Sequence, residues 1–194
     1  SVNTRNRAVT LQDYINLAVQ VPGVGKANAV AGSWTSVTVY VQPQDDGTYT
    51  PGIVSGSATG AWNDIALAVQ SALQEPSLIG TTVTVSPPTY VPVYAKMNVL
   101  IDGAYKQSTV VINIKKALLS ATGIFSYDNN VFARVISPSA VVAAVYAVEG
   151  ILSVDVTALN TDNANGLGTI TLNPDQVPYI TASALTITPT GGHS

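Results

Sequence analysis

The stretch Ala18-Val19-Gln20-Val21-Pro22-Gly23-Val24-Gly25-Lys26-Ala27 joins a helical pattern to a strand pattern across a proline and a glycine. Proline cannot continue a helix, and glycine supplies the left-handed backbone that commonly ends one. The same order recurs at Val148-Glu149-Gly150-Ile151, where a second helical pattern stops and a strand pattern begins at once. Such junctions are typical of αβ units. They predict an α+β fold, built either by duplication or by two instances of a common junction.

Outward from the first junction, apolar residues repeat at helical spacing from Leu11 to Val21, and Thr10 with Asp13 supplies capping chemistry. The predicted elements that follow are strands at 26–31 and 36–42, a long exposed loop at 43–60, a helix at 62–74 and a strand at 81–86. The double proline Pro87-Pro88 then predicts a stiff joint and a domain boundary, because it can neither continue a helix nor donate to a sheet.

The second half begins with a long alternating strand, which we expect to turn at Asp102-Gly103. Asn165-Gly166 predicts a hairpin. The strand after the second junction is expected to turn Leu152, Val154, Val156 and Ala158 inward. The predicted elements are strands at 91–101, 151–159, 169–172 and 184–188, and helices at 107–121 and 138–148.

This order predicts an α+β protein with two small modules in tandem, each with helices on one face of an antiparallel sheet. Their pattern approximates the split β-α-β, ferredoxin-like arrangement. We place the first module at 1–88, with its long loop at 43–60, the second at 89–188, and a flexible tail at 189–194.

The composition points to a surface that other protein covers. Hydrophobic residues make up 46% of the chain and charged residues 10%, against about 25% charged in an ordinary soluble domain. Interface cores are depleted in charge, so we favour assembly. A threonine-rich β-protein with a neutral but free surface is the alternative.

Several function classes lack their sequence features. The net charge is −3 and the basic residues are scattered, whereas nucleic-acid binding needs a dense basic stripe. No apolar run approaches the roughly 20 residues that span a bilayer. The chain has no cysteine, and its one histidine, His193, lies in a glycine-rich tail. We therefore predict no nucleic-acid binding and no membrane insertion.

The sequence contains no complete catalytic or ligand-binding motif. Gly23-Val24-Gly25-Lys26 superficially resembles a phosphate loop, but the residues that the motif needs before and after it are absent. The segment 161–172 resembles a calcium loop but has no carboxylate at its first or last position. The acidic residues lie mostly at helix ends and turns. We predict no catalytic, cofactor-binding or metal-binding residues, and hence no enzyme.

Aromatic residues in predicted loops and on polar strand faces are the remaining candidates. Tyrosine and tryptophan combine a large apolar ring with a polar group, which suits both protein interfaces and sugar-binding surfaces. The candidate interface residues are Trp34, Tyr40, Tyr49, Tyr94, Tyr127 and Tyr179.

Taken in order, these features resemble a known family. The segment from Asn6 to Tyr14, Asn-Arg-Ala-Val-Thr-Leu-Gln-Asp-Tyr, followed by the quoted stretch from Ala18 to Ala27, is similar to the baseplate J family of phage tails and related contractile injection systems. Weaker matches follow in order, and the resemblance covers about 6–187: Ile79 to Val85, Tyr90-Val91-Pro92-Val93, Val148 to Ile151, and Asp175 to Ile180. The family's longer N-terminal region has no counterpart, which suggests the C-terminal part or a short variant.

The resemblance implies a structural, non-catalytic component of a phage-type tail baseplate, assembled in the host cytoplasm. It implies binding to other baseplate proteins and to copies of itself in a ring around a central hub. It carries over no cofactor and no ligand or catalytic residue. The alternative from another class is a receptor- or carbohydrate-binding module that uses the aromatic loops.

Overall fold

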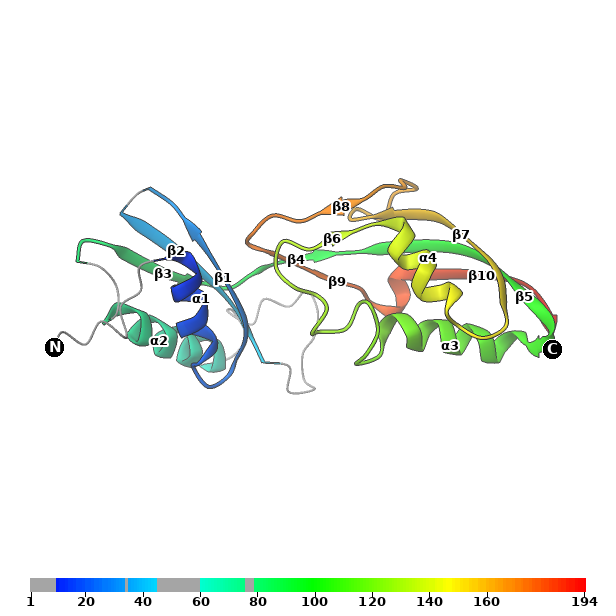
Figure 1. Cartoon of the computed structure of the whole chain (residues 1–194), viewed down its shortest axis with the longest axis horizontal. Coiled ribbons are helices and arrows are strands. Elements are labelled where there is room, and N and C mark those ends of the chain that lie inside the picture. Colours follow the sequence, from blue (N-terminus) through cyan, green and yellow to red (C-terminus); the bar gives the residue numbers. More distant parts are fainter. Residues whose placement is uncertain (1–9, 34, 45–59, 76–78) are drawn as a thin grey trace. The chain divides into compact units, whose positions relative to one another are not determined.

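The computed structural model describes residues 10–33, 35–44, 60–75 and 79–194 (Figure 1). The chain divides into two compact units. The first comprises residues 1–89 with 174–176, and the second comprises residues 90–173 with 177–194. Each unit has its own apolar core.

The first unit packs two helices on a sheet of three strands, ordered β1-β2-β3. Strand β2 runs antiparallel to β1 and parallel to β3, because α2 crosses over between β2 and β3. The core joins Tyr14 and Ala18 of α1, Val69 and Leu73 of α2, and the inward-facing valines of the sheet. The elements are α1 (Leu11–Val19), β1 (Val24–Ala31), β2 (Ser36–Pro43), α2 (Gly60–Gln74) and β3 (Thr82–Ser86).

Local sequence fixes the start of α1, as predicted. The hydroxyl of Thr10 accepts from the Asp13 N–H at 3.2 Å, and the Asp13 carboxylate accepts from the Thr10 N–H at 2.9 Å. This reciprocal capping box satisfies two of the N–H groups that a helix start leaves unpaired.

The second unit is built around β5, which is flanked by β10 and β7 in the order β10-β5-β7. Strand β5 is parallel to β10 and antiparallel to β7. Its buried residues Ala95, Met97, Val99 and Ile101 alternate as the sequence predicts, and they pack with Val110, Ile114 and Leu118 of α3. The elements are β4 (Thr89–Pro92), β5 (Tyr94–Lys106), α3 (Gln107–Leu119), β6 (Val135–Ile136), α4 (Pro138–Tyr146), β7 (Ile151–Asn160), β8 (Ile170–Thr171), β9 (Gln176–Tyr179), a 3-10 turn at Ala182–Ala184 and β10 (Leu185–His193).

The two helix-glycine-strand junctions have the same geometry. Gly23 has φ +92° and Gly150 has φ +91°. The carbonyl of Gly23 accepts from the Gln44 N–H at 2.8 Å, and that of Gly150 accepts from the Asp102 N–H at 2.9 Å. In both units the helix thus leads, through a left-handed glycine, into the strand that pairs antiparallel with the central strand.

The α+β class is confirmed, with helices packed on a sheet in each unit. We predicted antiparallel sheets, but each three-stranded sheet contains one antiparallel pair and one parallel pair of strands. Both parallel pairs join strands whose connection runs through at least one helix, which strand patterns alone do not reveal.

Three local predictions for the second unit differ from the structure. Strand β5 continues through Asp102-Gly103 to Lys106 instead of turning. The strand after Asn165-Gly166 pairs with β6, so no hairpin with β7 forms. Leu152 is 50% exposed, because a bulge in the β5–β7 pairing leaves it without a partner and displaces the inward alternation.

The segment at 189–193, expected to be part of a flexible tail, continues β10 alongside β5. Gly191 and Gly192 have φ +74° and +69°. A side chain at Gly191 would collide with the Ile101 carbonyl, and Gln107 Nε2 donates to the Gly191 carbonyl at 2.9 Å. The glycines thus permit close packing here rather than freedom.

Candidate protein interface

The structure places four of the six candidate aromatic residues, and all four are half-buried. Tyr40 lies on β2, Tyr94 begins β5, Tyr127 follows α3, and Tyr179 ends β9. The Tyr179 carbonyl accepts from the Val93 N–H at 2.8 Å, so its backbone belongs to the sheet structure beside β5. Trp34 and Tyr49 lie outside the described residues. Of these four residues, Tyr40 belongs to the first unit and the other three belong to the second.

A more exposed apolar surface lies at α4 and the start of β7. Tyr146 is 55% exposed and Leu152 is 50% exposed, and the Tyr146 hydroxyl donates to the Leu152 carbonyl at 3.0 Å. Helix α4 has no charged residue, and Ala140 and Ala143 are exposed on it. Helices that are apolar all round are usually buried, so this face is suited to contact with protein. The sequence pattern assigned Tyr146 to a helix but did not single it out.

The strand edges carry features that prevent pairing with other strands. On β3, the Thr82 N–H donates to the Thr35 carbonyl at 2.7 Å and thus faces β2. The backbone N–H and carbonyl of the next residue, Val83, therefore point to the free edge of the sheet. The Gln70 side chain of α2 covers that edge by donating to the Val83 carbonyl at 2.7 Å. In the second unit, β10 carries Pro189 and β7 has two bulges. Prolines and bulges both disrupt edge pairing.

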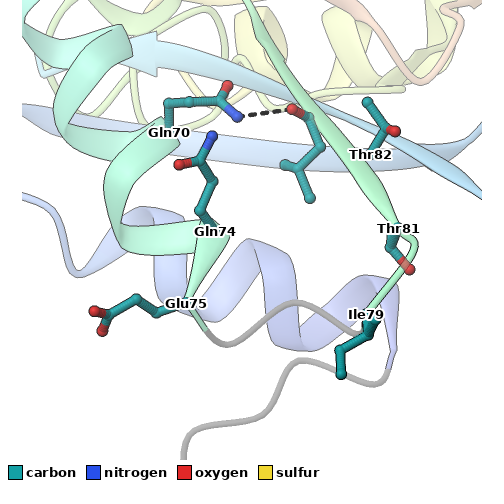
Figure 2. Close-up of a pocket in the computed structure, with 7 residues that line it drawn as sticks. Gln70, Gln74, Glu75, Ile79, Thr81 and Thr82 are labelled. Carbon is teal, nitrogen blue, oxygen red and sulfur yellow. Dashed lines mark hydrogen bonds between the residues drawn. The ribbon is translucent and has the colours of Figure 1, made fainter.

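A shallow pocket of about 390 Å³ lies between the end of α2 and β3 (Figure 2). Figure 2 shows the Gln70 side chain reaching β3 and the Gln74 side chain pointing toward the Gln70 amide, while Glu75 points away from Thr81 and Thr82. Gln74, Glu75 and Ile79 are exposed, so the pocket does not exclude water. With one carboxylate and no second titratable group, its lining offers no acid-base pair: Gln70, Gln74, Glu75, Ile79, Thr81, Thr82 and Val83.

Titratable groups in the described part of the chain form no reactive cluster. No three acidic or histidine side chains there approach closely enough to hold a metal ion. The Tyr105 hydroxyl donates to Glu149 Oε1 at 2.9 Å, and this hydrogen bond with the nearby carboxylate charge raises the pKa of Tyr105. The Nδ1 atom of His193 lies 3.1 Å from the neighbouring Ser194 carbonyl oxygen. Among the described helices, none has the length and apolarity needed to cross a membrane.

Comparisons with known proteins find similarity to a baseplate family and to a chain of a solved baseplate structure. Residues 6–86 match the family model described as Baseplate J-like central domain. Among solved structures, the fold is similar to a chain in the cryo-EM structure of the anti-feeding prophage baseplate, 6-fold symmetrised, with a TM-score of 0.65 and 13% identity. That likeness covers 91% of this chain and 38% of the other, so the chain spans less than half of its structural relative. No curated protein matches the sequence.

Proposed function

We propose that the chain is a structural component of a phage-type tail baseplate, since its residues 6–86 match the model of the Baseplate J-like central domain. The family match carries this proposal. The fold it shares with a baseplate chain over 91% of its length adds support, because the likeness extends into the second unit. The low charge content and the uncharged, exposed face of α4 suit a protein that its neighbours cover.

In this role the chain binds other baseplate proteins and copies of itself arranged around a central hub. This assembly takes place in the host cytoplasm. Its function is shape and contact, not catalysis. The contacts use faces and loops rather than strand edges, since Gln70, Pro189 and the bulges of β7 blunt three of those edges.

The receptor- or carbohydrate-binding alternative gains no support from the aromatic residues. Tyr127 is half-buried, and Tyr49 lies outside the described residues. Tyr127 does not line the pocket between α2 and β3.

Mass spectrometry of purified tail particles tests the proposal. We expect this chain at a fixed stoichiometry to other baseplate proteins, and we expect particles from a deletion strain to lack a complete baseplate by electron microscopy. Intact particles of normal composition from the deletion strain would rule the structural role out.

A further inference from the structure

Arg134 lies in the irregular segment between α3 and β6. Its Nη1 donates to Asn130 Oδ1 at 2.7 Å, and its Cζ lies 5.5 Å from the centre of the Phe125 ring. No described carboxylate forms an ion pair with it. The side chain is half-buried, and burial lowers the pKa of Arg134. Side-chain hydrogen bonding thus uses one of the five N–H donors that a guanidinium offers.

The residues around the guanidinium hold it in place. Asn130 is 8% exposed and donates from Nδ2 to the Phe125 carbonyl at 3.0 Å, which fixes the amide that accepts from Arg134. Phe125 is 5% exposed and belongs to the core of the second unit. The Arg134 carbonyl accepts from the Leu172 N–H at 3.1 Å. The guanidinium and the backbone of Arg134 are therefore both held by hydrogen bonds. The side chain thus has little conformational entropy left to lose on binding.

The backbone beside Arg134 is strained, and its flanks are apolar. Ala133 has φ +56°, a left-handed conformation that costs a residue with a Cβ about 1–2 kcal/mol. Val131 and Val135, on either side, are 44% and 59% exposed. Strain of this kind persists where the surrounding structure imposes it, and it concentrates at functional positions. Arginine is enriched among interface hot spots, and here exposed valines lie three positions before it and one position after it in the sequence.

We propose that Arg134 binds a carboxylate of an aspartate or glutamate on a neighbouring baseplate protein, with Val131 and Val135 packing around the ion pair; this inference rests on the proposed function. The guanidinium fork matches a carboxylate in two parallel hydrogen bonds. A phosphate backbone fits less well, because nucleic-acid binding needs several cations and the neighbours of Arg134 are apolar.

The test compares incorporation of variants into tail particles. Arg134→Gln keeps a donor for Asn130 but removes the charge, while Lys115→Gln removes one exposed charge from α3 and serves as the control. We expect the control at wild-type level and the Arg134→Gln chain reduced about tenfold in competition with wild type. Arg134→Gln at wild-type level would overturn the inference alone. Absence of the wild-type chain from particles would overturn the proposed function as well.

A second variant covers the case in which Arg134→Gln folds poorly, as thermal melting would reveal. Arg134→Lys retains the charge and places an amine where a carbodiimide can join it directly to a carboxylate in contact with it. In assembled particles we expect a zero-length cross-link from residue 134 to an aspartate or glutamate of another protein chain, identified by peptide mass spectrometry. A cross-link only to a carboxylate of the same chain, or none, would overturn the inference.

Discussion

At the scale of single residues, the left-handed glycines at the helix-strand junctions make the sharpest prediction. A Cβ on Gly150 would lie 2.8 Å from the Tyr105 ring, and the φ of +91° is unfavourable to any side chain. Gly150→Ala should therefore lower the free energy of unfolding by about 1–3 kcal/mol in urea titrations. Gly103→Ala is the matched control, because a Cβ there meets nothing within 4 Å. Equal stability of the two variants would contradict the assigned role of Gly150.

Tyr105 adds a pH-dependent contribution at the same junction. Its hydrogen bond to Glu149 and the adjacent charge raise its pKa above the ordinary value of 10.0, so the folded state favours the protonated hydroxyl. The resulting stabilisation is fully present below pH 10 and is lost as the pH rises through the raised pKa. The stability difference between wild type and Tyr105→Phe should thus shrink above pH 10. Glu149→Gln should move the tyrosinate absorbance transition of Tyr105 downward, and an unmoved transition would refute the assignment.

At the scale of elements, the edge of β3 depends on one side chain of α2. Gln70→Ala removes the donor to the Val83 carbonyl and should cost about 1 kcal/mol of stability. It also exposes the edge, so light scattering should show more self-association than in wild type. Gln74→Ala, one turn further along α2 and exposed, should change stability by less than about 0.5 kcal/mol. Association of both variants alike would mean that Gln70 does not guard the edge.

Helix α3 offers an internal comparison of core and surface. Ile114 is 0% exposed and Ile112 is 54% exposed on the same helix. Ile114→Ala should lower the free energy of unfolding by about 2–5 kcal/mol, because it removes buried methyl groups and leaves a cavity. Ile112→Ala should change it by about 0.5 kcal/mol or less in the isolated chain. A large effect of Ile112→Ala there would show that Ile112 packs against protein in solution.

Elements were predictable from the sequence where their determinants are local. The Thr10 cap, the alternation along β5 and the glycine junctions all depend on neighbouring residues. Strand pairing was less predictable, because β10 and β5 are separated in the sequence by most of the second unit. In addition, a bulge at Leu152 changes which side chains of β7 are buried. Arg134 could not be recognised from sequence, since its surroundings come from Phe125, Asn130 and Leu172 only after folding.

At the scale of the whole molecule, the chain returns to its first unit near its end. Residues 174–176 belong with residues 1–89. The Thr89 N–H donates to the Asp175 carbonyl at 2.8 Å, and Asn28 Nδ2 donates to the Pro174 carbonyl at 2.7 Å. Pro87-Pro88 suggested a single joint between two consecutive halves, and no local pattern announces this return. The stability of the first unit therefore includes a contribution from sequence far beyond it.

That contribution can be measured in the full chain, because both tryptophans, Trp34 and Trp62, belong to the first unit. Tryptophan fluorescence during urea unfolding thus reports the first unit, while circular dichroism reports helices of both units. Asn28→Ala should lower the stability seen by fluorescence by about 1 kcal/mol, since it removes the donor to Pro174. Asn98→Ala, an exposed position on β5, should leave the fluorescence transition unchanged. If Asn28→Ala leaves it unchanged as well, residues 174–176 add nothing to the stability of the first unit through this contact.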